Sequence, residues 1–240
     1  MQDSSAAGGG GRELVSPHDW RARIEARLAN TRPRHAMDDW LTPGLSVRES
    51  RALQAYYPAA PIPAAVLVPL IERDDELTVL LTQRASQLKN HAGQISFPGG
   101  RIEPEDAGPR EAALREAHEE IGLEAQFVSV VGFLADHIVL TGFRVTPVVG
   151  FVRPGFDLLL DRDEVADTFE VPLSHVFEPA NHRSRRRQFG SMPGELQVWD
   201  IEYEGHNIWG ATAGMLLNLY RLCVTDDAAT IRELAGARDE

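Results

Sequence analysis

Apolar residues recur along this chain with two different periods, and each period predicts one type of secondary structure. In the segment HDWRARIEARLAN, the apolar residues Trp20, Ile24 and Leu28 are spaced as on one face of a helix. Ser16 and Pro17 come just before them and suit the N-cap and the first helical position. An amphipathic helix is therefore expected near the N-terminus.

Runs of β-branched and aliphatic residues predict strands in the body of the chain. PAAVLVPLI (63–71) and LTVLLTQRA (77–85) are joined by the polar turn ERDDE and form a predicted hairpin. Further strands are expected at 94–97, where FPGG ends the strand, and at 127–134, 145–152 and 196–203. Helices are expected at 109–121, 212–224 and 227–236. This order predicts a mixed sheet covered by helices, an α+β or α/β/α arrangement.

Composition divides the chain into three parts. Residues 1–60 are expected to be an N-terminal extension that wraps on the main domain. Within it, residues 1–13 are small, Gly-rich and expected to be disordered, and a segment rich in Pro and Arg follows the predicted helix. Residues 61–224 form the predicted main domain, and residues 225–240 a C-terminal helix and tail.

The charge and the cysteine content exclude several function classes. The formal net charge of −12 argues against binding to long nucleic acids and against docking on anionic membranes, since both rely on Lys and Arg. A small anionic ligand remains compatible with it. The single cysteine, Cys223, allows no intrachain disulfide and indicates a reducing compartment. No apolar run has the length of a signal peptide core or a membrane span, so the protein is expected to be cytoplasmic.

Three glutamates cluster at the C-terminal end of the predicted helix 109–121. Glu116 and Glu120 are four residues apart and Glu119 is three from Glu116, so their carboxylates share one helix face. Clustered carboxylates are what a hard cation such as Mg²⁺ requires, together with water and substrate phosphates. The alternative is a solvated acidic face. The helix dipole disfavours anions at this end, which weighs against that alternative.

The stretch GGRIEPEDAGPREAALREAHEEIGL (99–123) resembles the Nudix box, G-x5-E-x7-R-E-U-x-E-E-x-G-U with U aliphatic. Its second half, from Arg115 to Leu123, matches at every fixed position with Ala117 as the aliphatic residue. Its first half is one residue longer than usual. Either Asp106 or Glu105 therefore takes the place of the first acid of the box.

The stretch LLTQRASQLKNHAGQISFPGG (80–100) resembles the signature of coenzyme A pyrophosphatases in this family, L-L-T-x-R-[SA]-x3-R-x3-G-x3-F-P-G-G. Lys89 stands where that branch usually has Arg. The resemblance implies a Nudix-type α/β/α sandwich with a mixed β-sheet, carrying helical extensions at both ends, with residues 61–224 as the Nudix domain. It also implies metal-dependent hydrolysis of the diphosphate of coenzyme A or its derivatives, giving 3′,5′-ADP and 4′-phosphopantetheine or its acyl form.

The resemblance also implies roles for individual residues. Glu116 and Glu120 are expected to hold Mg²⁺ or Mn²⁺, with Glu119 as a third ligand or a water-orienting group. Arg115 is expected to orient a ligating glutamate. The residues expected at the substrate are Arg84, Lys89, Gly99 and Gly100, and the run NHRSRRRQFG (181–190) either contacts the 3′-phosphate or is a solvated loop.

Other readings remain open at this stage. A hydrolase of ADP-ribose or another nucleotide sugar would use the same box. A non-catalytic nucleotide-sensing module is an alternative of a different class, and a homodimer is possible in either case. His137, Trp199 and Trp209 are expected to be structural rather than part of the site.

Overall fold

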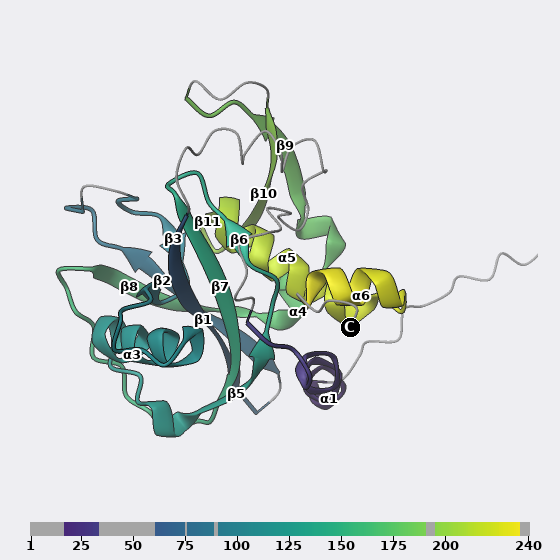
Figure 1. Cartoon of the computed structure of the whole chain (residues 1–240), viewed down its shortest axis with the longest axis horizontal. Helices are drawn as coiled ribbons and strands as arrows, with labels where there is room; N and C mark the ends of the chain where they lie inside the picture. The colour runs from purple at the N-terminus through teal and green to yellow at the C-terminus, as the bar shows by residue number, and fades with distance from the viewer. Residues whose placement is uncertain (1–16, 34–60, 75, 89–90, 191–194, 236–240) are drawn as a thin grey trace, which may run out of the picture.

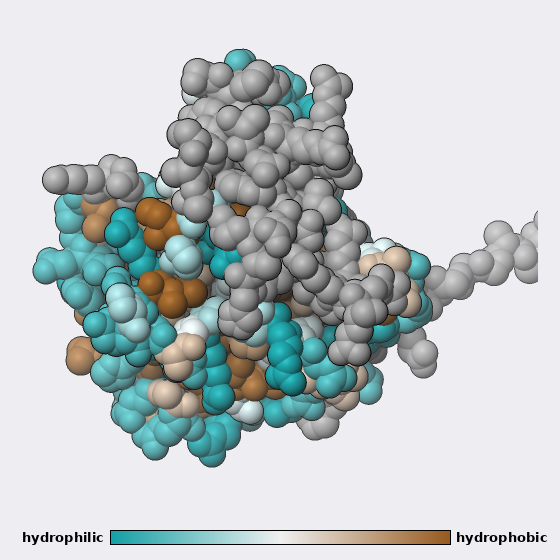
Figure 2. Space-filling view, viewed as in Figure 1, coloured by the Kyte–Doolittle hydropathy of each residue, from teal (hydrophilic) through white to brown (hydrophobic). Residues whose placement is uncertain are grey.

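The computed structural model describes residues 17–33, 61–74, 76–88, 91–190 and 195–235. These residues form a mixed β-sheet between two helical layers, with a second, smaller sheet beside it (Figure 1). The predicted α+β class with a mixed sheet covered by helices is confirmed. On the face shown in Figure 2, hydrophilic residues cover most of the described surface, with hydrophobic residues in small groups between them.

The larger sheet is built around one parallel strand pair. Strand β1 (Ile62–Glu72) pairs in parallel with β7 (Phe143–Val152), and the remaining pairings in the sheet are antiparallel. Strands β3, β2, β1, β7 and β5 follow one another across it, with β4 paired to β1, β6 to β7 and β8 to β2. The other strands are β2 (Leu77–Arg84), β3 (Ile95–Ser96), β4 (Gly99–Arg101), β5 (Val128–Phe133), β6 (His137–Ile138) and β8 (Val165–Pro172).

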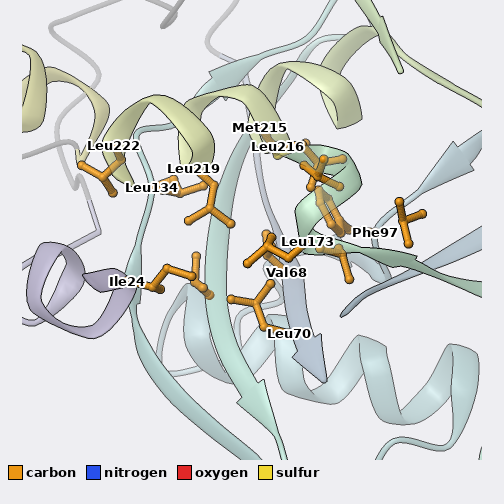
Figure 3. Close-up of a cluster of buried hydrophobic side chains, with 14 of the residues drawn as sticks. Ile24, Val68, Leu70, Phe97, Leu134, Leu173, Met215, Leu216, Leu219 and Leu222 are labelled. Carbon is orange, nitrogen blue, oxygen red and sulfur yellow. The ribbon is translucent and has the colours of Figure 1, made fainter. Parts of the chain in front are cut away.

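Alternate side chains of the central strands supply two cores. Leu67 joins a cluster with Ala117 and Ile121 of helix α3 (Pro109–Ile121) on one face of the sheet. Val68 points to the opposite face, because successive residues of a strand alternate. Figure 3 shows this second cluster, to which α1, α4 and α5 contribute. The helices on this face are α1 (Pro17–Leu28), α4 (Leu173–Val176), α5 (Gly210–Val224) and α6 (Ala228–Leu234).

The smaller sheet lies next to the N-terminus of α5. It has the order β11-β10-β9 and is antiparallel, with β9 (Arg183–Arg187), β10 (Leu196–Tyr203) and β11 (His206–Trp209). Strand β11 runs directly into α5, so the small sheet is tied to the helical layer. Two short 3₁₀ turns, at Ala125–Phe127 and Pro179–Asn181, complete the described elements.

FPGG ends the predicted strand at 94–97 as expected, because β3 stops at Ser96, but Gly99–Arg101 pairs with β1 as a separate strand, β4. The loop alternative for the arginine run was wrong, because Arg183–Arg187 is a strand on β10. The predicted helix 109–121 and strand 196–203 are confirmed at both ends.

The division into 1–60, 61–224 and 225–240 stays a prediction, and most of 1–60 lies outside the described residues. Within the described part of the chain, no helix is long and apolar enough to cross a bilayer.

Candidate active site

Helix α3 is closed at both ends by residues that suit those positions. Pro109 occupies the first turn, where its missing N–H removes no hydrogen bond. Gly122 ends the helix in the left-handed conformation, at φ 70°, and its N–H donates to the carbonyl of His118 at 2.9 Å. Ala117 and Ile121 pack on the sheet, which fixes the rotation of the helix about its axis. Glu116 and Glu120 consequently lie along the edge of the helix that faces β4.

Arg115 donates hydrogen bonds to four residues through one guanidinium. Its Nε and Nη2 donate to the two carboxylate oxygens of Asp106, at 3.1 and 2.9 Å. Its Nη1 donates to Glu116 at 2.9 Å and to Glu119 at 3.0 Å. Nη2 also donates to the carbonyl of Arg101 at 3.1 Å. Because it binds Glu116 directly, Arg115 is placed to orient that carboxylate.

The structure distinguishes the two candidates for the first acid of the box. The Asp106 side chain is only 6% exposed and pairs with Arg115, whereas Glu105 is exposed. Asp106 Oδ2 also accepts a hydrogen bond from the Glu103 N–H at 2.8 Å, which closes a turn in the loop. Hydrogen bonding to Arg115 lowers the pKa of Asp106. The longer loop therefore folds back as a turn that brings an aspartate, one carbon shorter than glutamate, to Arg115.

Glu120 is a buried carboxylate with few partners. Its side chain is 5% exposed, and Oε2 accepts a hydrogen bond from the Gly99 N–H at 3.2 Å. The nearest cation is Arg84, whose Nη1 lies 3.9 Å from Oε1. Burial raises the pKa of Glu120 to about 8. Only glycine fits at position 99, because a Cβ there would lie 2.4 Å from the carbonyl oxygen of Ala65 on the neighbouring strand β1.

Glu116 lies against the neighbouring glycine of the same strand. A Cβ on Gly100 would come within 2.5 Å of the Glu116 carboxyl carbon. Burial raises the pKa of Glu116, although Arg115 acts in the opposite direction. Glu119, by contrast, has a side chain that is 56% exposed and is held by Arg115. Of the three glutamates, Glu116 and Glu120 are thus the two that face β4 together.

These residues line one cavity of about 680 Å³. Glu116, Glu120, Arg84, Gly99 and Gly100 all contribute to its wall. The remaining wall is mainly apolar and comes from β1, β6, β7, β10, β11, α5 and the segment between β2 and β4. The structure therefore gathers five of the predicted site residues in one cavity wall. Arg115 and Glu119 do not line the cavity, and Lys89 lies outside the described residues.

The four arginines of β9 differ in their surroundings. Arg183 pairs with Glu202 at 2.7 Å, Arg186 with Glu195 at 3.5 Å, and Arg185 with Asp200. The guanidinium of Arg187 instead lies 5.1 Å from the ring centroid of Trp209, which lines the cavity.

Sequence reasoning missed several residues that line the cavity. Glu164 comes just before β8, and its charge contributes to the raised pKa of both Glu116 and Glu120. Asn218 is a buried residue of the same wall, and neither it nor Glu164 had an assigned role in the sequence. His137, Trp199 and Trp209 were expected to be structural rather than part of the site, but all three line the cavity.

The donor set suits a hard divalent cation. Among the described residues, no group of three or more His, Cys, Asp or Glu side chains is placed to hold a metal by itself. Mg²⁺, however, usually takes one or two carboxylates and completes its octahedron with water and substrate phosphates. The buried pair Glu116 and Glu120 provides those carboxylates. Burial is the main cause of the raised pKa of each, and Arg115 and Arg84 oppose it only in part.

Comparison with known proteins shows the family. The NUDIX domain model matches residues 61–191. The chain is 40% identical over 156 residues to the uncharacterized Nudix hydrolase NudL of Enterobacter sp. (strain 638) and to that of Citrobacter koseri, a match covering 65% of this chain and 80% of each relative. Among solved structures, the Nudix hydrolase RenU from M. smegmatis is 24% identical with a TM-score of 0.42, over 49% of this chain and 74% of that one.

A second solved structure, DR0079 from Deinococcus radiodurans, is 15% identical with a TM-score of 0.45, over 69% of this chain and 88% of that one. Nudix hydrolases act on nucleoside diphosphate derivatives and generally use divalent metal cations. The match of the NUDIX domain model spans more than half of the 240 residues. The chain therefore belongs to the Nudix hydrolase family.

Proposed function

We propose that this protein hydrolyses the diphosphate bond of coenzyme A or its derivatives, giving 3′,5′-ADP and 4′-phosphopantetheine or its acyl form. One observation carries the choice of substrate. The segment 80–100, which resembles the coenzyme A pyrophosphatase signature, supplies much of the cavity wall through Arg84, His91, Gln94 and Phe97. The motif thus lies where a substrate would bind rather than on a distant surface.

The chemical problem is to bring water to a phosphorus atom that negative oxygens already surround. A bound divalent cation supplies positive charge to the diphosphate and activates water for attack. Glu116 and Glu120 are proposed to hold that cation, with Glu119 as a third ligand or a water-orienting group. Arg115 acts on the same site without touching substrate, by fixing the Glu116 carboxylate through its hydrogen bond.

Arg84 is proposed to bind a phosphate oxygen of the substrate. It lines the cavity near Glu120, and its buried Nε has no hydrogen-bond partner among the described residues. Gly99 and Gly100 are proposed to act by letting the backbone of β4 lie close to β1 and to the Glu116 carboxylate. Glu164 lines the same cavity and is exposed, so it is available to accept the proton from the attacking water.

The test is a substrate panel with Mg²⁺ or with Mn²⁺, consisting of coenzyme A, acyl-coenzyme A, ADP-ribose, NADH and diadenosine polyphosphates. We expect the highest kcat/KM for a coenzyme A species, with both half-products identified by mass. Faster turnover of ADP-ribose than of every coenzyme A species would contradict the proposal and would favour the nucleotide-sugar alternative.

A matched pair of variants separates catalysis from ligand sensing. Glu120→Gln removes a proposed ligand with little change of shape, and Glu111→Gln changes an exposed glutamate in the first turn of the same helix. We expect Glu120→Gln to lose activity and Glu111→Gln to keep it. Absence of metal-dependent turnover by the wild-type protein on every substrate would instead support the sensing module.

A further inference from the structure

The cavity continues beyond the carboxylates to the other face of the sheet. Glu116 and Glu120 come from α3, whereas a second group of wall residues comes from α5, which packs on the opposite face (Figure 1). Met215 and Leu217 belong to this second group and are apolar. A ligand that fills the cavity must therefore extend from a charged end to an apolar end.

Asn218 is an exception in this apolar end. It lines the cavity, is only 1% exposed, and its Nδ2 has no hydrogen-bond partner in the described part of the chain. A buried amide without a partner costs stability, so such groups in native proteins need an explanation. A ligand that supplies the missing acceptor is one such explanation.

A second polar side chain lies one helical turn away. Gly214 and Asn218 are four residues apart, so they share one face of α5. Because Gly214 has no side chain, the ring of His137 can come close, and a Cβ there would lie 3.1 Å from its Nε2. Burial lowers the pKa of His137 to about 4, so the ring is neutral at pH 7. Asn218 and His137 are thus two neutral polar groups of the far wall. Arg221 of α5 also lines the cavity, and its guanidinium lies 5.3 Å from the ring centroid of Trp199.

We propose that Asn218 binds an amide carbonyl oxygen in the non-nucleotide arm of the substrate, with His137 beside it. A neutral donor in an apolar wall suits a neutral acceptor on a mainly apolar chain, which is the chemistry of the pantetheine arm of coenzyme A. This inference rests on the proposed function and adds where the second arm of the substrate binds.

The experiment compares two variants. Asn218→Leu replaces the amide by a hydrocarbon side chain of similar volume, and Asn207→Leu makes the same change at an exposed asparagine of β11. Three quantities are measured: kcat/KM on coenzyme A and on ADP-ribose, the melting temperature, and the affinity for pantetheine by calorimetry. For Asn218→Leu we expect about a tenfold loss of kcat/KM on coenzyme A, the effect of one hydrogen bond. On ADP-ribose the change is expected to be less than about twofold, since that substrate offers no amide carbonyl to this end of the cavity.

The melting temperature distinguishes binding from structure. Replacing an unpartnered buried donor by a hydrocarbon is expected to raise it by about 2–4 °C, while Asn207→Leu leaves all three quantities unchanged. A lower melting temperature with equal losses on both substrates would show that Asn218 is structural and would overturn the inference.

The inference and the proposed function can fail separately. If coenzyme A is turned over but Asn218→Leu changes neither its kcat/KM nor the pantetheine affinity, the subsite is wrong and the proposed function stands. If coenzyme A is not turned over but pantetheine binds the wild-type protein and not Asn218→Leu, the subsite stands and the proposed function is wrong.

Discussion

Replacing Asp106 by Asn tests whether Arg115 depends on that carboxylate to hold the glutamates of the site. In the wild-type protein, Asp106 accepts two hydrogen bonds from Arg115 and a third from the backbone of Glu103. Asn presents an NH₂ group to the guanidinium in place of one oxygen, so a donor meets a donor. Arg115 then loses its fixed position and with it the orientation of Glu116.

The size of the effect follows from the burial of the pair. Hydrogen bonds to a charged partner contribute about 1.5–3 kcal/mol to stability. The Arg115 side chain is 30% exposed, so solvent weakens the interaction and a loss of about 2 kcal/mol is expected. For a protein of this size that corresponds to a fall in melting temperature of about 4–8 °C. Metal affinity is expected to fall about 10–100-fold, as for other residues that orient a metal ligand.

The assay is urea unfolding at several pH values, combined with calorimetric titration of Mn²⁺. Because Arg115 lowers the pKa of Asp106 in the folded protein, the contribution of Asp106 to stability is complete above the unfolded pKa of about 3.8. It is lost as the pH falls through the lower, folded pKa. The difference between wild type and variant should therefore be constant from pH 5 to 8 and shrink below about pH 4.

Glu105→Gln is the control, since Glu105 is the neighbouring and exposed candidate for the same role. It should change the free energy of unfolding by less than about 0.5 kcal/mol, as surface substitutions usually do. An equal or larger effect of Glu105→Gln, or an unchanged metal affinity in Asp106→Asn, would refute the assignment of Asp106.

Three further predictions concern the site and the cavity. At pH 7.5 in EDTA, Glu120→Gln should be more stable than wild type by on the order of 4 kcal/mol. The pKa of Glu120 is raised to about 8, so its ionisation costs stability as the pH rises from 4.5 through 8. A variant that is less stable in urea unfolding would contradict this. Gly100→Ala should reduce kcat/KM at least about tenfold, because the new Cβ would displace Glu116. Gly108→Ala is the control: the nearest atom to its new Cβ is 3.8 Å away, so its kcat/KM should equal that of the wild type. The pKa of His137 is lowered to about 4, so the free energy of unfolding of the wild type should fall by about 3 kcal/mol as the pH drops from 6.5 to 4. In unfolding experiments at a series of acid pH values, His137→Gln should not show this dependence.

Local spacing was enough to predict the glutamate arrangement. Glu116 and Glu120 share a face because a helix repeats every 3.6 residues, and Pro109 and Gly122 mark its ends. These features depend on residues close together in the sequence. The resemblance to the Nudix box then favoured a metal site on this helix over a solvated acidic face.

Elements that depend on partners distant in the sequence were not predicted. Gly99–Arg101 has the low strand propensity of glycine and forms β4 only because β1 lies beside it. Arg183–Arg187 has the charge of a solvated loop, but carboxylates of β10 and its ends neutralise most of it. Glu164 reaches the site because Arg84 on β2 pairs with Val165 on β8. The sequence of either strand alone does not show which residues of β2 and β8 pair.

The site is arranged so that its charge is balanced only in part by the protein. Arg115 forms ion pairs with Asp106, Glu116 and Glu119, so one positive charge is shared by three carboxylates. Among the described residues, the only cation near Glu120 is Arg84, at 3.9 Å. Full pairing of each carboxylate would stabilise the fold but would leave no attraction for a cation. On the proposed function, this imbalance is what the metal relieves, so binding and stability are linked. Wild-type melting temperature should then rise with Mg²⁺ concentration, and the rise should vanish in Glu120→Gln.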